Sequence, residues 1–166
     1  MRALVKARPE RGIWMQEQPV PDIGPQDVLV KVHKTGICGT DVHIFNWDEW
    51  ASRTVPIPMI TGHEYAGEIA ALARRCATSA SAACFRRGTR GGRIKPRGAR
   101  RQISPGSGHQ GHWGKLPGAF AEYVRVPAFN VIALPDSVDD EIGAILDPLG
   151  NAVHTTLSFD IVGEDV

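Results

Sequence analysis

Hydrophobic and polar residues alternate along several short stretches of the chain, with the period of a half-buried β-strand. The clearest stretch is 27–34, in which Val28, Val30 and Val32 share one face. Weaker forms of the pattern predict strands over residues 2–6, 64–72, 120–126 and 130–134. A short helix is expected over 39–45, directly after the strongest strand. Prolines and glycines between these stretches are typical of turns, so the pattern predicts a mainly β domain with flanking helices.

The last part of the chain has the signals of a helix that begins near residue 139. Ser137 and Asp140 have the spacing of a helix-capping box. We expect Pro148 and Gly150 to interrupt the helix and 152–159 to resume it. The residues expected to face the core are Ile142, Ile145 and Leu146.

Charge divides the chain unevenly. Residues 73–115 contain 11 Lys and Arg and no Asp or Glu, which leaves the rest of the chain with a net charge of −10. This segment is rich in Ala, Ser, Gly and Arg and has almost no apolar periodicity, so we expect it to be extended or disordered. Two interpretations remain open for it, a basic arm that binds nucleic acid through phosphate contacts and a long solvated loop.

Length and cysteine content restrict the class of protein. A chain of 166 residues suits one domain with a real core. No apolar run of about 18 residues is present, and the N-terminus lacks the apolar core of a signal peptide, so we expect a cytoplasmic protein with no membrane partner. The three cysteines, Cys38, Cys76 and Cys84, form no Cys-x-x-Cys pair, which argues against a disulfide framework or a four-cysteine zinc knuckle.

Three residues at strand ends have side chains that zinc accepts as ligands. Cys38 follows the strongest strand, and His63 and Glu64 begin another. A catalytic zinc needs three protein ligands and one open position. Taken alone the trio is weak, because a single Cys is often a small buried hydrophobe, a single His a structural residue and a single Glu an ion-pair partner.

Two longer runs of sequence carry a family resemblance. Lys34–Trp50 contains Cys-Gly-Thr-Asp, and Pro58–Gly67 contains Gly-His-Glu-x-x-Gly. Together they resemble the zinc-dependent medium-chain dehydrogenases. Asn46–Trp50 and Asp147–Thr155 are similar to the L-threonine 3-dehydrogenase branch of that superfamily rather than to its alcohol or polyol branches. The resemblance covers residues 1–72 and 116–166.

The resemblance implies a GroES-like β-barrel catalytic domain with one catalytic zinc. Cys38, His63 and Glu64 would be the zinc ligands, Thr40 and His43 would relay the substrate proton to solvent, and Asp147 would support that relay near the zinc. The implied reaction converts L-threonine and NAD to 2-amino-3-oxobutanoate and NADH, in a homotetramer. Local alternatives are a helix cap for Thr40, a surface position for His43 and turn chemistry for Asp147.

The sequence departs from the family at two places. The family has a lobe with four close cysteines and a structural zinc where this chain has 73–115, so we expect that zinc to be lost. A pair of compensating frameshifts would explain the change in composition at constant length. The second departure is the end, where 160–166 matches only the start of the dinucleotide-binding domain. The one Gly-x-Gly-x-x-Gly of the chain, at residues 106–111, lies within 73–115 and follows no predicted strand, so we expect the Rossmann domain to be lacking.

The expected organisation is therefore a catalytic domain formed by 1–72 and 116–159, with an aberrant segment between them. We expect a fragment of a threonine dehydrogenase that is inactive alone and has no nucleic-acid partner. Two alternatives stay open. One is another zinc-dependent polyol or alcohol dehydrogenase, and the other is a non-catalytic GroES-like module with a basic nucleic-acid-binding arm.

Overall fold

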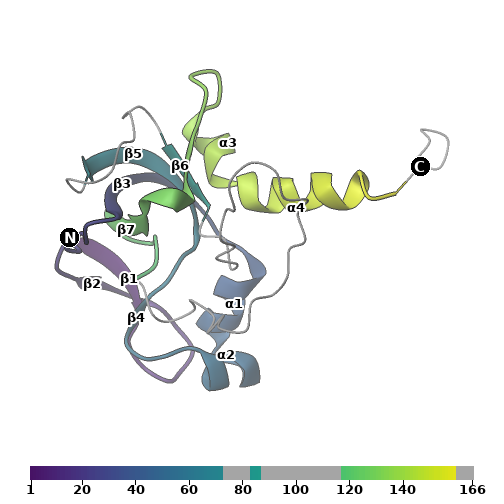
Figure 1. Cartoon of the computed structure of the whole chain (residues 1–166). Coiled ribbons are helices and arrows are strands. Elements are labelled where there is room, and N and C mark those ends of the chain that lie inside the picture. The colour runs from purple at the N-terminus through teal and green to yellow at the C-terminus, as the bar shows by residue number, and fades with distance from the viewer. Residues whose placement is uncertain (73–82, 87–116, 160–166) are drawn as a thin grey trace.

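Antiparallel pairing organises the chain into two sheets (Figure 1). The computed structural model describes residues 1–72, 83–86 and 117–159. One sheet has the order β2-β1-β4 and the other the order β7-β3-β5-β6-β8. The strands of the first sheet are β1 (Arg2–Lys6), β2 (Trp14–Glu17) and β4 (Met59–Ile60). The strands of the second are β3 (Asp27–Gly36), β5 (Glu64–Leu72), β6 (Ala83–Arg86), β7 (Tyr123–Pro127) and β8 (Val131–Ala133).

The helices flank these sheets at two places (Figure 1). They are α1 (Gly39–Asn46), α2 (Glu49–Thr54), α3 (Asp140–Ala144) and α4 (Leu146–Thr156), with a 3₁₀ turn at Ala128–Asn130. In Figure 1, α4 extends away from the sheets, and none of its residues is buried. Within the described parts of the chain, no helix is long and apolar enough to cross a membrane.

The predicted apolar face of β3 forms the centre of the core. Val28 and Val30 are fully buried, and they pair across the sheet with Val126 and Val124 of β7. Tyr65 and Ala119 complete this cluster. A second, smaller cluster packs beneath the first two helices and contains Ile44, Ala51 and Val55. The fold class expected from the alternating pattern, mainly β with flanking helices, is confirmed.

Backbone hydrogen bonds close one sheet against the other. The Leu4 N–H donates to Phe120 O over 2.8 Å, and the Phe120 N–H donates to Thr61 O over 2.9 Å. These bonds engage Phe120 outside the ladder of β7, so this strand begins at Tyr123 and not at residue 120 as predicted. The chain before β7 thereby joins β1 and β4 to the larger sheet.

The C-terminal helical region differs from the sequence prediction. The N-cap of α3 is Asp139, whose carboxylate accepts a hydrogen bond from the Ile142 N–H, so the capping box at Ser137 is wrong. Ile142 and Ile145 are 46% and 47% exposed and do not face the core. Gly143 and Ala144 face it instead, because small residues let this short helix approach the sheet closely.

Pro148 does not interrupt the following helix as predicted. It lies in the first turn of α4, which begins at Leu146 and continues through Gly150 without a break. The N–H groups of a first turn have no intrahelical partner, so the missing proline N–H costs nothing there.

Some elements were absent from the prediction. These are β2, α2, β4 and β6. The expectation of disorder does not hold at Ala83–Arg86, because these four residues pair with β5 on one side and β8 on the other. Backbone pairing needs no apolar periodicity, and two neighbouring strands supply the partners. The rest of 73–115 lies outside the described residues.

Lys6 is a fully buried lysine that joins the smaller sheet to the end of α1. Its Nζ donates to Glu10 O over 2.5 Å and to Gly12 O over 2.9 Å. The ammonium also lies over the Trp47 and Trp14 rings, 4.7 Å and 5.6 Å from their centroids. Burial lowers the pKa of this group, and Glu10 offsets part of that effect. Trp47 is the left-handed C-cap of α1, so Lys6 holds the helix that carries the site described below.

Lys6→Ala should destabilise the protein by about 3 kcal/mol, because it leaves two carbonyl groups without their donor and opens a cavity between two indoles. Urea unfolding followed by tryptophan fluorescence measures this loss. Arg8→Ala is the matched control, since the Arg8 guanidinium also stacks on Trp14 but its side chain is 59% exposed. A comparable loss in both variants would contradict a specific role for Lys6.

Candidate metal centre

The ends of two paired strands bring the candidate ligands together. β3 and β5 are antiparallel, with Gly36 opposite Glu64. Cys38 lies two residues beyond Gly36, and His63 lies one residue before Glu64. The Cys38 Sγ and the His63 Nε2 are 3.0 Å apart, although 25 positions separate the residues in sequence. The structure therefore brings together Cys38 and His63, two of the residues singled out by the sequence.

Cys38 is also the N-cap of α1. Its Sγ accepts a hydrogen bond from the Thr40 N–H over 3.3 Å, and the Asp41 carboxylate accepts one from the Cys38 N–H over 3.1 Å. This reciprocal pattern is a capping box. The start of the helix therefore fixes both the backbone and the sulfur of Cys38.

Gly62 sets the direction of the chain into His63. Its φ is +90°, a conformation that residues with a side chain rarely adopt. A Cβ at this position would lie 2.4 Å from the Phe120 ring. The glycine is thus required by backbone geometry and by the close approach of the segment that precedes β7.

Asp41 is a functional candidate that the sequence interpretation missed. It is only 3% exposed, and its Oδ1 lies 3.7 Å from His63 Nδ1. One ligand atom from each of Cys38, Asp41 and His63 lies within 4.8 Å of the other two. A carboxylate behind a metal-binding imidazole fixes the orientation and the tautomer of the ring. The signal was present in Cys-Gly-Thr-Asp, three residues after the cysteine.

Glu64 lies beside this cluster in a confined position. It is 7% exposed, and its Oε2 would be 2.6 Å from a Cβ at Gly36. Burial raises the pKa of the Glu64 carboxyl, the imidazole of His63 lowers it, and the negative charges of Asp147 and Asp41 raise it further. Among the described residues, the three-member cluster of possible metal ligands holds Asp41 and does not include Glu64.

Thr40 and His43 lie one turn apart on α1 and run from the buried start of the helix toward solvent. Thr40 is half-buried, whereas the His43 side chain is 59% exposed. The His43 Nδ1 forms a short contact with the Asp48 carboxylate, and the ring edge packs on Trp50. The Ala51 N–H and His43 hold the pKa of Asp48 below its usual range. Asp48, the N-cap of α2, therefore orients the histidine.

Asp147 reaches the site from the other side. It lies in the first turn of α4, just after α3, and its Oδ1 is buried. Its negative charge helps to raise the pKa of the Glu64 carboxyl. Among the described residues, the cluster of possible metal ligands formed by Cys38, Asp41 and His63 does not include Asp147.

This donor set fits a zinc ion. A tetrahedral zinc with one sulfur and one nitrogen ligand holds these atoms about 3.6 Å apart. The observed 3.0 Å between Sγ and Nε2 needs only a small widening to admit the ion. The buried carboxylates of Asp41 and Glu64 also favour a cation, because like charges in a region of low dielectric repel one another.

Comparison with known proteins identifies the family. Residues 24–136 match the model of the alcohol dehydrogenase GroES-like domain. The chain belongs to this family. An L-threonine 3-dehydrogenase of Ruegeria pomeroyi is 56% identical to this chain over 172 aligned residues. The alignment covers 100% of this chain and 49% of that protein.

Solved structures agree with this assignment. A zinc-binding dehydrogenase from Sinorhizobium meliloti, bound to NADP, matches with a TM-score of 0.74 and 25% identity over 96% of this chain and 46% of that one. The 2R,3R-butanediol dehydrogenase of Bacillus subtilis has the same fold, with a TM-score of 0.74, 22% identity and coverage of 96% and 48%. The chain spans about half the length of the curated relatives it matches.

Glu64→Gln should stabilise the metal-free protein at neutral pH. Because burial and the neighbouring carboxylates raise the pKa of Glu64 in the folded state, the folded protein keeps a proton that the unfolded chain releases. Stability therefore falls as the pH rises from the ordinary pKa of Glu through the raised one. The amide has no such penalty, so the gain should shrink as the pH falls below the ordinary pKa.

Denaturant unfolding of the metal-free protein between pH 4 and pH 8 measures this difference. Glu122→Gln is the control with the opposite sign, since the Arg2 N–H lowers the pKa of exposed Glu122. That variant should lose a little stability at neutral pH. A destabilised Glu64→Gln protein at pH 7 would contradict the prediction.

Proposed function

We propose that this chain is the metal-bearing catalytic domain of an L-threonine 3-dehydrogenase. The observation that carries the proposal is the approach of Cys38 Sγ to His63 Nε2, with the Asp41 carboxylate behind the imidazole. The donor types and their separation suit a zinc ion. The 56% identity to the Ruegeria pomeroyi enzyme supports threonine as the substrate.

In this proposal Cys38 and His63 hold the zinc, and Glu64 supplies the third ligand. When bound, the zinc acts as a Lewis acid that lowers the pKa of the substrate hydroxyl. Asp41 is the orienting partner of His63, because its Oδ2 accepts from the Cys38 N–H and its Oδ1 faces His63 Nδ1 at 3.7 Å. In this proposal the side chain of Glu64, the residue that follows His63, turns toward the pair to complete the ligand set.

The proposed proton route runs along α1. Thr40 lies next to the metal ligand Cys38, and His43 lies one turn later at the surface. A hydroxyl both accepts and donates a proton, and an imidazole does so near neutral pH. Asp48 holds the His43 ring by its Nδ1 and leaves Nε2 for exchange with solvent. Asp147 contributes negative charge beside Glu64 and supports the route without being a ligand.

The complete reaction would convert L-threonine and NAD⁺ to 2-amino-3-oxobutanoate, NADH and a proton. The proposal assigns no residues to the hydride acceptor, because the one Gly-x-Gly-x-x-Gly, at residues 106–111, follows no predicted strand and lies outside the described residues. A tetrameric assembly remains a prediction. The loss of the structural zinc also remains a prediction, because Cys76 and the side chain of Cys84 lie outside the described residues.

Metal binding tests the proposal directly. The full 166-residue chain should bind one Zn²⁺, and Co²⁺ in its place should give a sulfur-to-cobalt charge-transfer band. Cys38→Ser should abolish that band, and His63→Ala should weaken affinity at least about 100-fold. Asp41→Asn should keep the band and weaken affinity about 10- to 100-fold, the usual effect of losing a carboxylate behind a ligand.

His154→Ala is the matched control for His63→Ala, because His154 lies on the exposed face of α4. Its affinity for Co²⁺ should equal that of the wild-type chain. Two results would each overturn the single-site proposal. One is a sulfur-to-cobalt band that persists in Cys38→Ser, and the other is Zn²⁺ binding that persists in the double variant Cys38→Ser, His63→Ala.

The zinc-loaded chain should produce no NADH from L-threonine and NAD⁺, because it supplies the metal centre and proton route without an assigned hydride-acceptor site. Absorbance at the NADH maximum measures the product, and a chain extended to the full length of its relatives is the positive control. NADH formation by the 166-residue chain alone would show that these residues hold the nucleotide themselves.

A further inference from the structure

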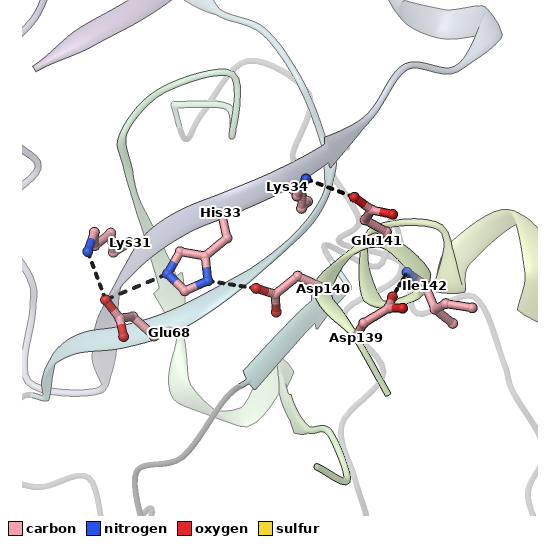
Figure 2. Close-up of polar contacts among 8 residues, drawn as sticks. All are labelled: Lys31, His33, Lys34, Glu68, Asp139, Asp140, Glu141 and Ile142. Atoms are coloured by element: carbon pink, nitrogen blue, oxygen red, sulfur yellow. Dashed lines mark hydrogen bonds and ion pairs between the residues drawn. The ribbon is translucent and has the colours of Figure 1, made fainter. Parts of the chain in front are cut away.

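Two consecutive residues of β3 form ion pairs with two consecutive residues of α3 (Figure 2). His33 Nδ1 lies 2.7 Å from the Asp140 carboxylate, and Lys34 Nζ lies 2.9 Å from that of Glu141. The other ring nitrogen of His33 faces Glu68 of β5 at 3.6 Å. An imidazolium can donate to carboxylates from both nitrogens. We refer to the His33–Asp140 and Lys34–Glu141 pairs as the α3 clamp.

A β-bulge explains how neighbouring strand residues both reach the same helix. Consecutive side chains of a regular strand point to opposite faces. Val32 pairs with Gly67 and Lys34 pairs with Ala66, so His33 is an extra residue on β3. A bulge of this kind redirects side chains. Gly67 permits it, because a Cβ there would lie 2.1 Å from Lys31 O.

Apolar packing beneath α3 is slight. The large apolar side chains Ile142 and Ile145 are about half exposed. Contact with the sheet depends on small residues: a Cβ at Gly143 would lie 2.9 Å from that of Ala66. The clamp therefore acts together with the close packing of Gly143 and Ala144 to keep this helix in register on the sheet.

The position of α3 determines the position of Asp147. Ala144, the last residue of α3, has its carbonyl 3.4 Å from the Cβ position of Gly36, where the Glu64 carboxylate also lies. Asp147 follows three residues later in the first turn of α4, and no residue of α4 is buried. We propose that His33 and Lys34 are positioning residues that hold α3 through Asp140 and Glu141 and so place Asp147 beside Glu64 at the metal centre. The role at the metal rests on the proposed function.

The test changes only β3, so that the sequence and caps of α3 stay intact. In the metal-free 166-residue chain, His33→Gln with Lys34→Gln should accelerate amide exchange of Gly143 and Leu149 about tenfold, the combined effect of two surface ion pairs. These amides donate to Asp139 O and Ile145 O, the latter in the turn that carries Asp147. Exchange of the core amide of Val30 should not change, which shows that the fold is intact.

Lys31→Gln is a closely matched control for Lys34→Gln. Both lysines lie on β3, both side chains are 51% exposed, and both form an ion pair of about 3 Å, but Lys31 pairs with Glu68 on β5. The control should leave Gly143 and Leu149 exchange unchanged. Equal acceleration by Lys31→Gln, or none in the double variant, would overturn the positioning role.

A metal readout connects the clamp to Asp147. The double variant should bind Co²⁺ several-fold more weakly than the wild-type chain, and this loss should disappear when both proteins also carry Asp147→Asn. A loss that persists in full in the Asp147→Asn background would overturn the route through Asp147. Hydrogen exchange needs no metal, so a chain that binds no cobalt would overturn the proposed function while the exchange result still decides whether the clamp holds α3.

Discussion

The antiparallel register of β3 and β5 is the constraint on which the candidate site depends. Because Gly36 lies opposite Glu64, the residues just beyond these two positions must converge at one edge of the sheet. That convergence brings the Cys38 sulfur to His63 across 25 positions of sequence. A slip of one residue would turn every side chain of a strand to its other face. The buried valines Val28 and Val30 oppose such a slip, so the same apolar pattern that builds the core also builds the site.

The site concentrates buried negative charge around one histidine. Asp41 and Glu64 are buried, and the pKa of Glu64 is raised mainly by its burial, with the charges of Asp147 and Asp41 adding to that effect. Removing carboxylates from water without a compensating cation opposes folding. The buried carboxylates therefore lower the folding stability of the metal-free protein, and a bound cation would offset this loss. Residues selected for stability alone would not include such carboxylates.

Local patterns predicted the parts of the fold in which local chemistry decides the structure. Alternation located β3 and β5, and the residues after Cys38 do form a helix. The prediction failed where tertiary contacts decide. Ile142 has the spacing of a core residue, yet Gly143 faces the sheet because only a small residue fits against Ala66. Short β4 has too few residues to show a period of two, and its pairing with β1 defines it.

The site residues show the same division. Cys38 and His63 were predicted from motif and resemblance, and the structure brings them within 3.0 Å. Asp41 was missed although it belongs to the Cys-Gly-Thr-Asp motif, because its role depends on a contact with His63, 22 positions later, that the motif does not reveal. The metal-ligand roles of Cys38, His63 and Glu64 and the roles of Thr40, His43 and Asp147 stay predictions that the experiments above address.

The two sides of the site differ in how firmly they are held. Cys38, Asp41 and His63 are held by the pairing of β3 with β5, by the capping box of α1 and by the burial of Asp41. Asp147 lies on a helix with no buried residue, reached through a five-residue helix that two surface ion pairs fasten to β3. Segments with few buried contacts open locally at much lower free energy than the core. The cysteine and histidine are therefore in place before a metal arrives, whereas the contribution of Asp147 depends on the docking of α3.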